Sequence, residues 1–290
     1  MSKSSWRLTE GDEIAAGLLA MSRLGGGHAY EAYLAWSEPL HAHVVVKVIR
    51  PEQVDDSRTL RGLRREVAML KRLEHPVIVR SFGAQPDGAR PHVILEHLDG
   101  PRLSTLLRRY GPLPMEQLLP LALQICSALH YLAGQGVAHL DVKPSNIIMG
   151  SSPRLIDFSI ARTVEEAAAL DHVVGTDDFL SPEQCAPPES GIPGTASDIW
   201  GLGATMFLAC SGYLPFDIAV DHHKPSNWTH LLKCPAPLPR SVPQALVKPV
   251  LSCLEWRPEH RPTAAELASE LEPLVAALPK PVLGGLKLRR

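Results

Sequence analysis

The feature that most constrains this chain is the polar run H-L-D-V-K-P-S-N at residues 139–146, which is followed by D-F-S at residues 157–159. Asp141, Lys143, Asn146 and Asp157 therefore place two carboxylates, an amine and an amide within a short stretch of loop. A carboxylate can orient a hydroxyl group, and carboxylate and amide oxygens suit Mg²⁺. This set of groups favours phosphoryl transfer, which depends on a positioned nucleophile and a divalent ion at the phosphates.

Length and composition place few other limits on the chain. Its 290 residues suffice for one large domain or two lobes with their own cores, and 45% apolar with 21% charged residues is an ordinary globular balance. The net charge of −2 offers no basic field for nucleic acid, and we interpret the basic residues 286–290 as a solvated end. The sequence has neither an apolar signal core nor a run of about eighteen apolar residues, so we expect no membrane segment within this chain. It could still be the front of a longer membrane-anchored protein.

Cysteine and histidine follow no disulfide or metal pattern. The five cysteines are odd in number and include no C-x-x-C pair, which argues against a disulfide framework or a zinc site and fits a cytoplasmic location. The histidines at positions 41, 43, 222, 223 and 230 lack ligand spacing, so we do not expect them to bind a metal.

The hydrophobic pattern changes along the chain. Residues 43–49 and 92–95 are predicted strands, and residues 57–73 are a predicted helix with Ser57 as its N-cap. From about Arg102 the chain is mainly helical, and Pro120 is expected near the first turn of its helix. The predicted helices there are 115–133, 198–210, 243–254 and 263–277, the last capped by Thr263. A strand-rich first third joined to a helical remainder predicts an α+β protein with two lobes.

Further motifs stand on either side of the polar run. They are L-G-G-G at 24–27, V-V-K at 45–47, Glu66, G-T at 175–176, S-P-E at 181–183, D-I-W-G-L-G at 198–203, and Arg261. Together they resemble the motifs of the eukaryotic-type (Hanks-type) Ser/Thr protein kinase family. The Ala-, Arg- and Pro-rich composition of the chain is similar to that of the bacterial members. The resemblance implies a protein kinase domain at residues 18–275, with 276–290 as a C-terminal tail or the start of a linker. Its N-lobe, a small antiparallel sheet with one long helix, would span about 18–96, and a larger, mainly helical C-lobe about 101–275.

The resemblance also assigns roles around ATP and Mg²⁺. Asp141 matches the catalytic aspartate that accepts the substrate proton, and Lys143 would neutralise charge on the γ-phosphoryl group. Asn146 and Asp157 would bind the metal. The nucleotide would be bound by the Gly-rich loop, the strand lysine with its helix glutamate, and backbone groups of the segment after the gatekeeper Leu95. These residues are Leu24, Gly25, Gly27, Lys47, Glu66, Glu96 and Leu98.

Other matches concern the substrate and the scaffold. Lys143, with Thr176 ahead of the S-P-E segment, resembles the serine/threonine branch, which implies a hydroxyl of a protein as the acceptor. The family pairs residues like Glu183 and Arg261 as a buried ion pair. It uses an aspartate like Asp198 to hold the catalytic-loop backbone.

The chain departs from the family at several positions. Tyr30 replaces the third glycine of the phosphate loop, and Ala32 replaces the valine that packs on adenine. Leu140 stands where many kinases have the arginine that pairs with a phosphorylated activation segment, and residues 164–175 contain no Ser, Thr or Tyr. We therefore hypothesise that activity does not depend on phosphorylation of this segment. Ser159 replaces the glycine after Asp157-Phe158 and should restrict the backbone or add a local hydrogen bond.

Three functions remain open at this point. The first is an active Mg-ATP-dependent Ser/Thr protein kinase. The second is a pseudokinase-like scaffold that binds nucleotide or partners, motivated by Tyr30, Leu140 and Ser159. The third is a kinase of small molecules. A homodimer is possible.

Overall fold

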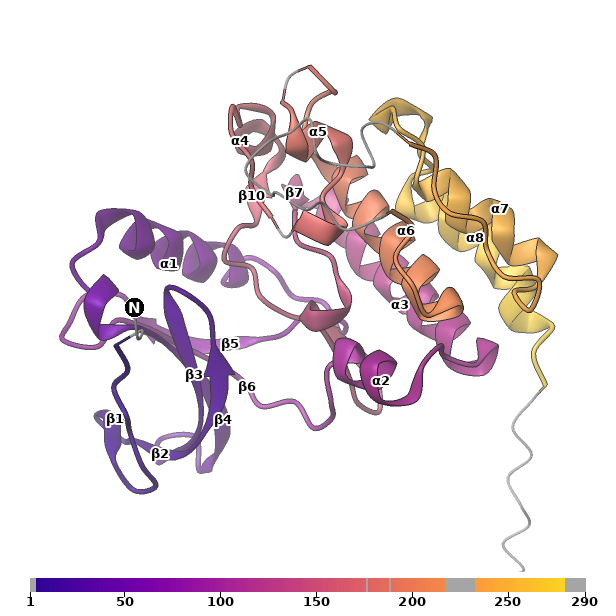
Figure 1. Ribbon diagram of the computed structural model, residues 1–290. Coiled ribbons are helices and arrows are strands. Elements are labelled where there is room, and N and C mark those ends of the chain that lie inside the picture. Colours follow the sequence, from indigo (N-terminus) through magenta and orange to yellow (C-terminus); the bar gives the residue numbers. More distant parts are fainter. Residues whose placement is uncertain (1–3, 176, 188, 217–232, 280–290) are drawn as a thin grey trace, which may run out of the picture.

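The computed structural model describes residues 4–175, 177–187, 189–216 and 233–279. Thr176, His222, His223, His230 and residues 286–290, on which some expectations rested, lie outside them. Figure 1 shows two lobes, one built from β1 to β6 with α1 and the other mainly helical. The predicted α+β architecture with a small sheet lobe and a larger helical lobe is confirmed.

Six antiparallel strands form the sheet within the described residues, in the order β1-β2-β3-β4-β6-β5. The strands are β1 (Glu13–Ala15), β2 (Leu18–Gly26), β3 (Tyr30–Ser37), β4 (Ala42–Ile49), β5 (Ser81–Gln85) and β6 (His92–Glu96). Alternation along β4 buries Val44, Val46 and Val48 in one core and turns Lys47 to the opposite face. The sheet begins at Glu13, ahead of residue 18.

Helix α1 (Ser57–Leu70) packs an amphipathic face against the sheet lobe. Its N-cap is Asp56, whose carboxylate accepts a hydrogen bond from Thr59 N at 2.7 Å. The prediction of Ser57 as the cap was wrong, because Asp56 has the extended backbone of a cap and Ser57 is the first helical residue. Glu66 is fully buried on this helix, together with Leu63.

The helical lobe is organised around α3 (Met115–Gly134). The other helices of this lobe are α2 (Leu103–Tyr110), α4 (Val164–Ala168), α5 (Pro182–Cys185), α6 (Thr195–Ser211), α7 (Gln244–Cys253) and α8 (Ala264–Ala276). For the four helices of this lobe whose bounds were predicted (α3, α6, α7 and α8), the ends differ by three residues or fewer, and Thr263 caps α8 as expected. Pro120 lies in the second turn of α3 rather than the first, where it removes one intrahelical hydrogen bond.

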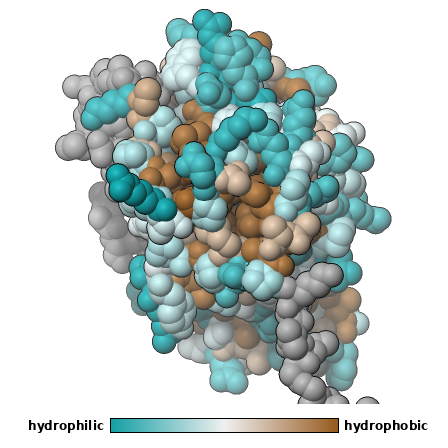
Figure 2. All heavy atoms as spheres, turned by 90° about the vertical axis from the view of Figure 1, so that its right-hand side faces the viewer, coloured by the Kyte–Doolittle hydropathy of each residue, from teal (hydrophilic) through white to brown (hydrophobic). Residues whose placement is uncertain are grey.

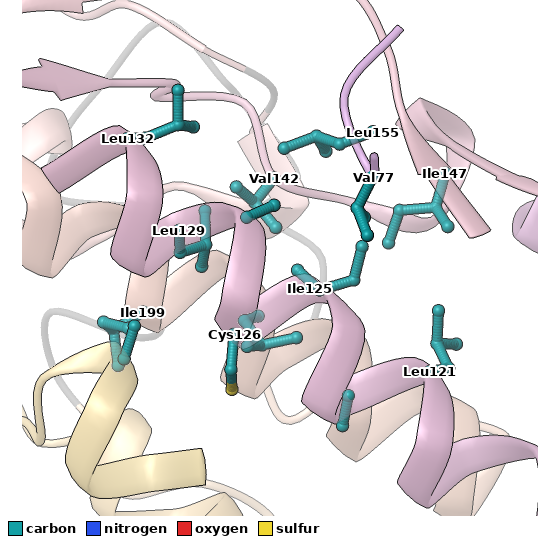
Figure 3. Packing of buried hydrophobic residues seen from close by; sticks show 14 of the residues in the cluster. Val77, Leu121, Ile125, Cys126, Leu129, Leu132, Val142, Ile147, Leu155 and Ile199 are labelled. Atoms are coloured by element: carbon teal, nitrogen blue, oxygen red, sulfur yellow. The ribbon is translucent and has the colours of Figure 1, made fainter. Parts of the chain in front are cut away.

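Two short hairpins shape the loop region of this lobe. Strand β7 (Val137–Ala138) pairs with β10 (Arg162–Thr163), and β8 (Ile147–Met149) pairs with β9 (Pro153–Leu155). Ile147 pairs with Leu155 at the open end of the second hairpin, so the chain enters and leaves this hairpin at the same place. Both side chains lie over α3 on the same side as Val77 (Figure 3), so the hairpin is fixed on the main core.

The end of the helical lobe that faces away from the sheet is made largely by α7 and α8. Figure 2 shows this face, on which hydrophobic side chains are visible between polar ones. No helix among the described residues combines the length and the apolar character needed to cross a membrane. All five cysteines are free, and only Cys234 among them is exposed.

Candidate active site

Three charged side chains meet where the sheet lobe contacts the helical lobe. The Nζ atom of Lys47, from β4, lies 2.9 Å from both Glu66 carboxylate oxygens, and Glu66 comes from α1. The same Nζ lies 2.7 Å from Oδ1 of Asp157, two residues after β9. The family resemblance assigned all three residues to one nucleotide and its metal, and the structure brings their side chains together.

Lys47 and Asp157 stabilise each other's charge, whereas burial raises the pKa of Glu66. Burial by itself lowers the pKa of the Lys47 ammonium, but the carboxylates of Asp157 and Glu66 outweigh burial and raise that pKa well above its usual value. Burial acts to raise the pKa of Asp157, yet Lys47 holds it well below its usual range. Lys47 and Asp157 are therefore both ionised at neutral pH.

A second polar group lies on the loop between β7 and β8. The Nζ atom of Lys143 is 2.9 Å from Oδ1 and 2.7 Å from Oδ2 of Asp141. The side-chain nitrogen of Asn146 donates to Oδ2 and to the main-chain oxygen of Asp141, at 2.8 and 2.9 Å. The amide oxygen of Asn146 is therefore the atom of this side chain that could bind a metal.

Asp198, at the start of α6, holds the backbone of this loop. Its carboxylate accepts hydrogen bonds from the N–H groups of His139 and Leu140, at 2.8 and 2.7 Å. Burial raises the pKa of Asp198 to about 7, although both N–H groups oppose this shift. One turn further along α6, a Cβ on Gly201 would lie 2.5 Å from the Val142 carbonyl oxygen, so helix and loop are in direct backbone contact.

The D-F-S segment is fixed by its own neighbours. Asp157 has a positive φ of 68°, which is uncommon for a residue other than glycine. Phe158 is fully buried and packs edge-on against the His139 ring, with ring centroids 4.7 Å apart. Ser159 also acts to lower the pKa of the Asp157 carboxyl group. The second metal-binding candidate is thus held by Lys47 on one side and by its own loop on the other.

Comparison with known proteins agrees with this geometry. The family described as "Protein kinase domain" matches residues 19–271. The chain belongs to the protein kinase family. Serine/threonine-protein kinase pkn2 of Myxococcus xanthus is 32% identical over 271 residues, covering 88% of this chain and 32% of that protein. Serine/threonine-protein kinase PknB of Mycobacterium leprae is 30% identical over 261 residues, covering 86% and 41%. This chain thus spans about a third to two fifths of the length of these curated relatives.

The Gly-rich segment that resembles the phosphate loop of the family runs from the end of β2 into the turn before β3. Leu24 is 52% exposed, and Gly25 has a φ of 146° with open space where a Cβ would stand. The middle glycine is the most constrained, because a Cβ on Gly26 would lie 2.5 Å from the Tyr30 carbonyl oxygen. The sequence analysis had singled out only its two neighbours.

Arg50 connects this loop to the rest of the sheet lobe. Its Nε donates to the Gly27 carbonyl at 2.8 Å, and its Nη1 lies 2.8 Å from both Glu31 Oε1 and the Ser4 carbonyl oxygen. Arg50 and Glu31 are both buried, so each charge depends on the other. The residues before β1 therefore contact the same buried pair that supports the phosphate loop; Trp6 adds a hydrogen bond to the Ile49 carbonyl at 2.8 Å.

The connection between the lobes begins at the end of β6. Leu95, the predicted gatekeeper, is buried at 8% exposure. The carboxylate of Glu96 lies 3.0 Å from Arg80 and 3.7 Å from Arg154, so its side chain is occupied and its backbone is the part suited to a ligand. Leu98 follows in the segment before α2 and is half-buried against the main core.

The predicted ion pair at the far end of the activation segment is present. Arg261 Nη1 and Nη2 lie 2.6 and 2.8 Å from the two carboxylate oxygens of Glu183, and both side chains are fully buried. Ser197 donates a further hydrogen bond to Glu183 at 2.7 Å. The Trp200 ring lies 4.9 Å from the Arg261 guanidinium carbon. The pair anchors α5 to α6.

Leu140 stands where many kinases have an arginine, and its surroundings in this chain are apolar. It is buried with Ala138 and with Ala167 of α4, in what we call the Leu140 cluster. The side-chain amide of Gln184 donates to the carbonyls of Leu140 and Val174, each at 2.9 Å. The activation segment is therefore joined to the catalytic loop by apolar packing and by one buried amide. The S-x-x-Q capping box at 181–184 was a sequence signal for Gln184.

The donor atoms at this site fit a magnesium ion. Asn146 and Asp157 supply an amide oxygen and carboxylate oxygens, and Mg²⁺ commonly binds one or two carboxylates together with substrate phosphates. Among the described residues, no group of three or more His, Cys, Asp or Glu side chains could hold a metal ion. The oxygen atoms of Asn146 and Asp157 suit a metal that is also bound by nucleotide phosphates.

Proposed function

We propose that this chain is a serine/threonine protein kinase that transfers the γ-phosphoryl group of Mg-ATP to a protein hydroxyl. The observation that carries this proposal is the position of Lys47, within 2.9 Å of Glu66 and 2.7 Å of Asp157. The cluster of Asp141, Lys143 and Asn146 on the adjoining loop supplies the other groups that the reaction needs.

Each side chain has a distinct task in this reaction. Asp141 accepts a hydrogen bond from the substrate hydroxyl and takes its proton as the bond to phosphorus forms. Lys143, already in contact with Asp141, stabilises negative charge on the transferred group. Lys47 orients the α- and β-phosphates. Asn146 and Asp157 would hold Mg²⁺, which supplies charge neutralisation at the phosphates when bound.

A direct test follows transfer of label from γ-labelled ATP to generic protein substrates and to the kinase itself. The proposal predicts labelling by the wild type and loss of labelling in Asp141→Asn and Lys47→Met. The pseudokinase-like scaffold is the second candidate, because Tyr30 and Leu140 depart from the family. That alternative predicts thermal stabilisation by Mg-ATP without labelling by the wild type.

We also propose that the kinase is of the non-RD type and does not require phosphorylation of its activation segment. Packing of Leu140 and the hydrogen bonds of Gln184 hold the segment without a phosphate. The test is a comparison of initial rates before and after phosphatase treatment, with the loss of phosphate checked by mass spectrometry. Equal rates support this proposal, and a large loss of activity after treatment refutes it.

The extent and setting of the kinase are further proposals. We place the kinase domain at residues 18–275, with lobes at about 18–96 and 101–275 and with 276–290 as a tail or linker. We propose a cytoplasmic location, a Ser/Thr-containing protein as substrate, no nucleic-acid partner, and a homodimer as one form of the chain. Truncation to these bounds followed by the label-transfer assay tests the first of these.

A further inference from the structure

Tyr30 occupies an unusual position beside the charged group of the active site. It is the first residue of β3 and stands at the end of the phosphate loop. Alternation along β3 puts it on the same face as Ala32, which is paired with Lys47 in β4. The Nζ atom of Lys47 lies 4.7 Å from the centroid of the Tyr30 ring. The partly buried face of this ring is a favourable partner for an ammonium group at this distance.

The other end of the tyrosine reaches α1. Its hydroxyl donates a hydrogen bond to the Thr59 carbonyl at 3.3 Å. A Cβ on Gly62 would lie 3.5 Å from the hydroxyl oxygen. Gly62 and Glu66 are four residues apart, so they share the face of α1 that looks toward Lys47. The ring thus lies alongside the Lys47–Glu66 pair, one helical turn closer to the start of α1.

The phenol of Tyr30 is suited to donate a hydrogen bond at any physiological pH. Burial raises the pKa of Tyr30 to about 12, with Lys47 opposing this shift. The hydroxyl therefore keeps its proton throughout the physiological range. One side chain connects three parts: the end of the phosphate loop, the lysine of β4 and the first half of α1.

We propose that Tyr30 is a positioning residue that fastens α1 to the phosphate loop and holds Lys47 against Glu66. It supports the Lys47–Glu66 pair from within the sheet lobe, in addition to the contact that Lys47 makes with Asp157. Only the kinetic test below rests on the proposed kinase function. The opposite view is that Tyr30 blocks the nucleotide site, and the experiments separate the two.

The first experiment measures amide hydrogen exchange across α1 in the nucleotide-free protein, and needs no catalysis. Tyr30→Phe removes the hydroxyl, and Tyr30→Leu also removes the aromatic face. We expect exchange in α1 to be a few times faster in the first variant and about tenfold faster in the second. Tyr110→Leu is the control, because Tyr110 is 68% exposed and lies on α2 in the other lobe. Exchange in Tyr30→Leu within twofold of the wild type would overturn the proposal.

The second experiment measures kcat and KM for ATP at a temperature where all variants are folded. We expect kcat/KM to fall about tenfold in Tyr30→Leu, with a smaller loss in Tyr30→Phe. Tyr30→Gly restores the family residue and should also lower kcat/KM. If it instead binds Mg-ATP more tightly and turns over faster, Tyr30 is a block and the proposal is wrong. A wild type that transfers no phosphate defeats the proposed function, while the exchange experiment still decides the role of Tyr30.

Discussion

Replacing Leu140 with alanine tests how the activation segment is held. The Leu140 side chain is 3% exposed and packs with Ala138 and Ala167, and Ile160 and Leu170 complete the cluster. Removing a buried leucine costs about 2–5 kcal/mol, depending on how far the site can collapse. This cluster is small and is bounded by the short helix α4, which can relax, so we expect a cost of about 2–3 kcal/mol. The backbone strain at Leu140 (φ 64°) is unchanged, because alanine also carries a Cβ.

The loss of stability in Leu140→Ala should be concentrated at the contact between α4 and the catalytic loop. We therefore expect amide exchange in α4 to accelerate about tenfold or more, and label transfer to fall by a similar factor. Residues 164–175 offer no hydroxyl on which a phosphate could replace this packing. Urea unfolding gives the global loss of stability.

Leu40→Ala is the matched control for this experiment. Leu40 is 46% exposed and lies in the turn between β3 and β4, so the same atoms are removed from a surface position. We expect its free energy of unfolding to change by less than about 0.5 kcal/mol. If Leu140→Ala keeps wild-type exchange in α4 and full activity, the apolar cluster does not hold the segment.

Three further predictions concern the ion pairs and the α6 contact. Glu183→Gln should lower the free energy of unfolding by about 3–5 kcal/mol, because it strands the buried charge of Arg261; urea unfolding measures this, and a loss below about 1 kcal/mol contradicts it. Gly201→Ala should lower both stability and label transfer, because a Cβ there would lie 2.5 Å from a catalytic-loop carbonyl; unchanged activity argues against the contact. Lys47→Met should lower the free energy of unfolding more at pH 7 than at pH 3. The Asp157 pKa is lowered in the fold, so its pairing stabilises above the unfolded pKa of about 3.9 and is lost as the pH falls. A loss in urea stability that is the same at both pH values contradicts this.

The sequence was sufficient for the broad fold and for the charged centre of the site. The valines around Lys47 alternate, so the strand and the face of its lysine follow from a period of two. The convergence of Lys47 with Glu66 and Asp157 could be inferred only from the family resemblance, because no local rule relates residues so distant in the chain.

Other features depend on contacts that local patterns do not encode. Asp56 and Ser57 are both good caps, and only the backbone shows which of them lies outside the helix. Tyr30 was recognised as a replaced glycine, but its contact with α1 requires the packed sheet lobe. The support of the phosphate loop by Arg50 likewise arises from tertiary packing, because Arg50 reads in the sequence as an ordinary charge after a strand.

The central claim is that separate side chains gather around one nucleotide and its metal. A crystal structure of the unphosphorylated chain with a non-hydrolysable ATP analogue and Mg²⁺ tests this most directly. We predict metal bound by Asn146 and Asp157, phosphates beside Lys47, and Glu66 still paired with that lysine. An analogue bound elsewhere at saturating concentration, or a metal held without Asn146 and Asp157, contradicts the account.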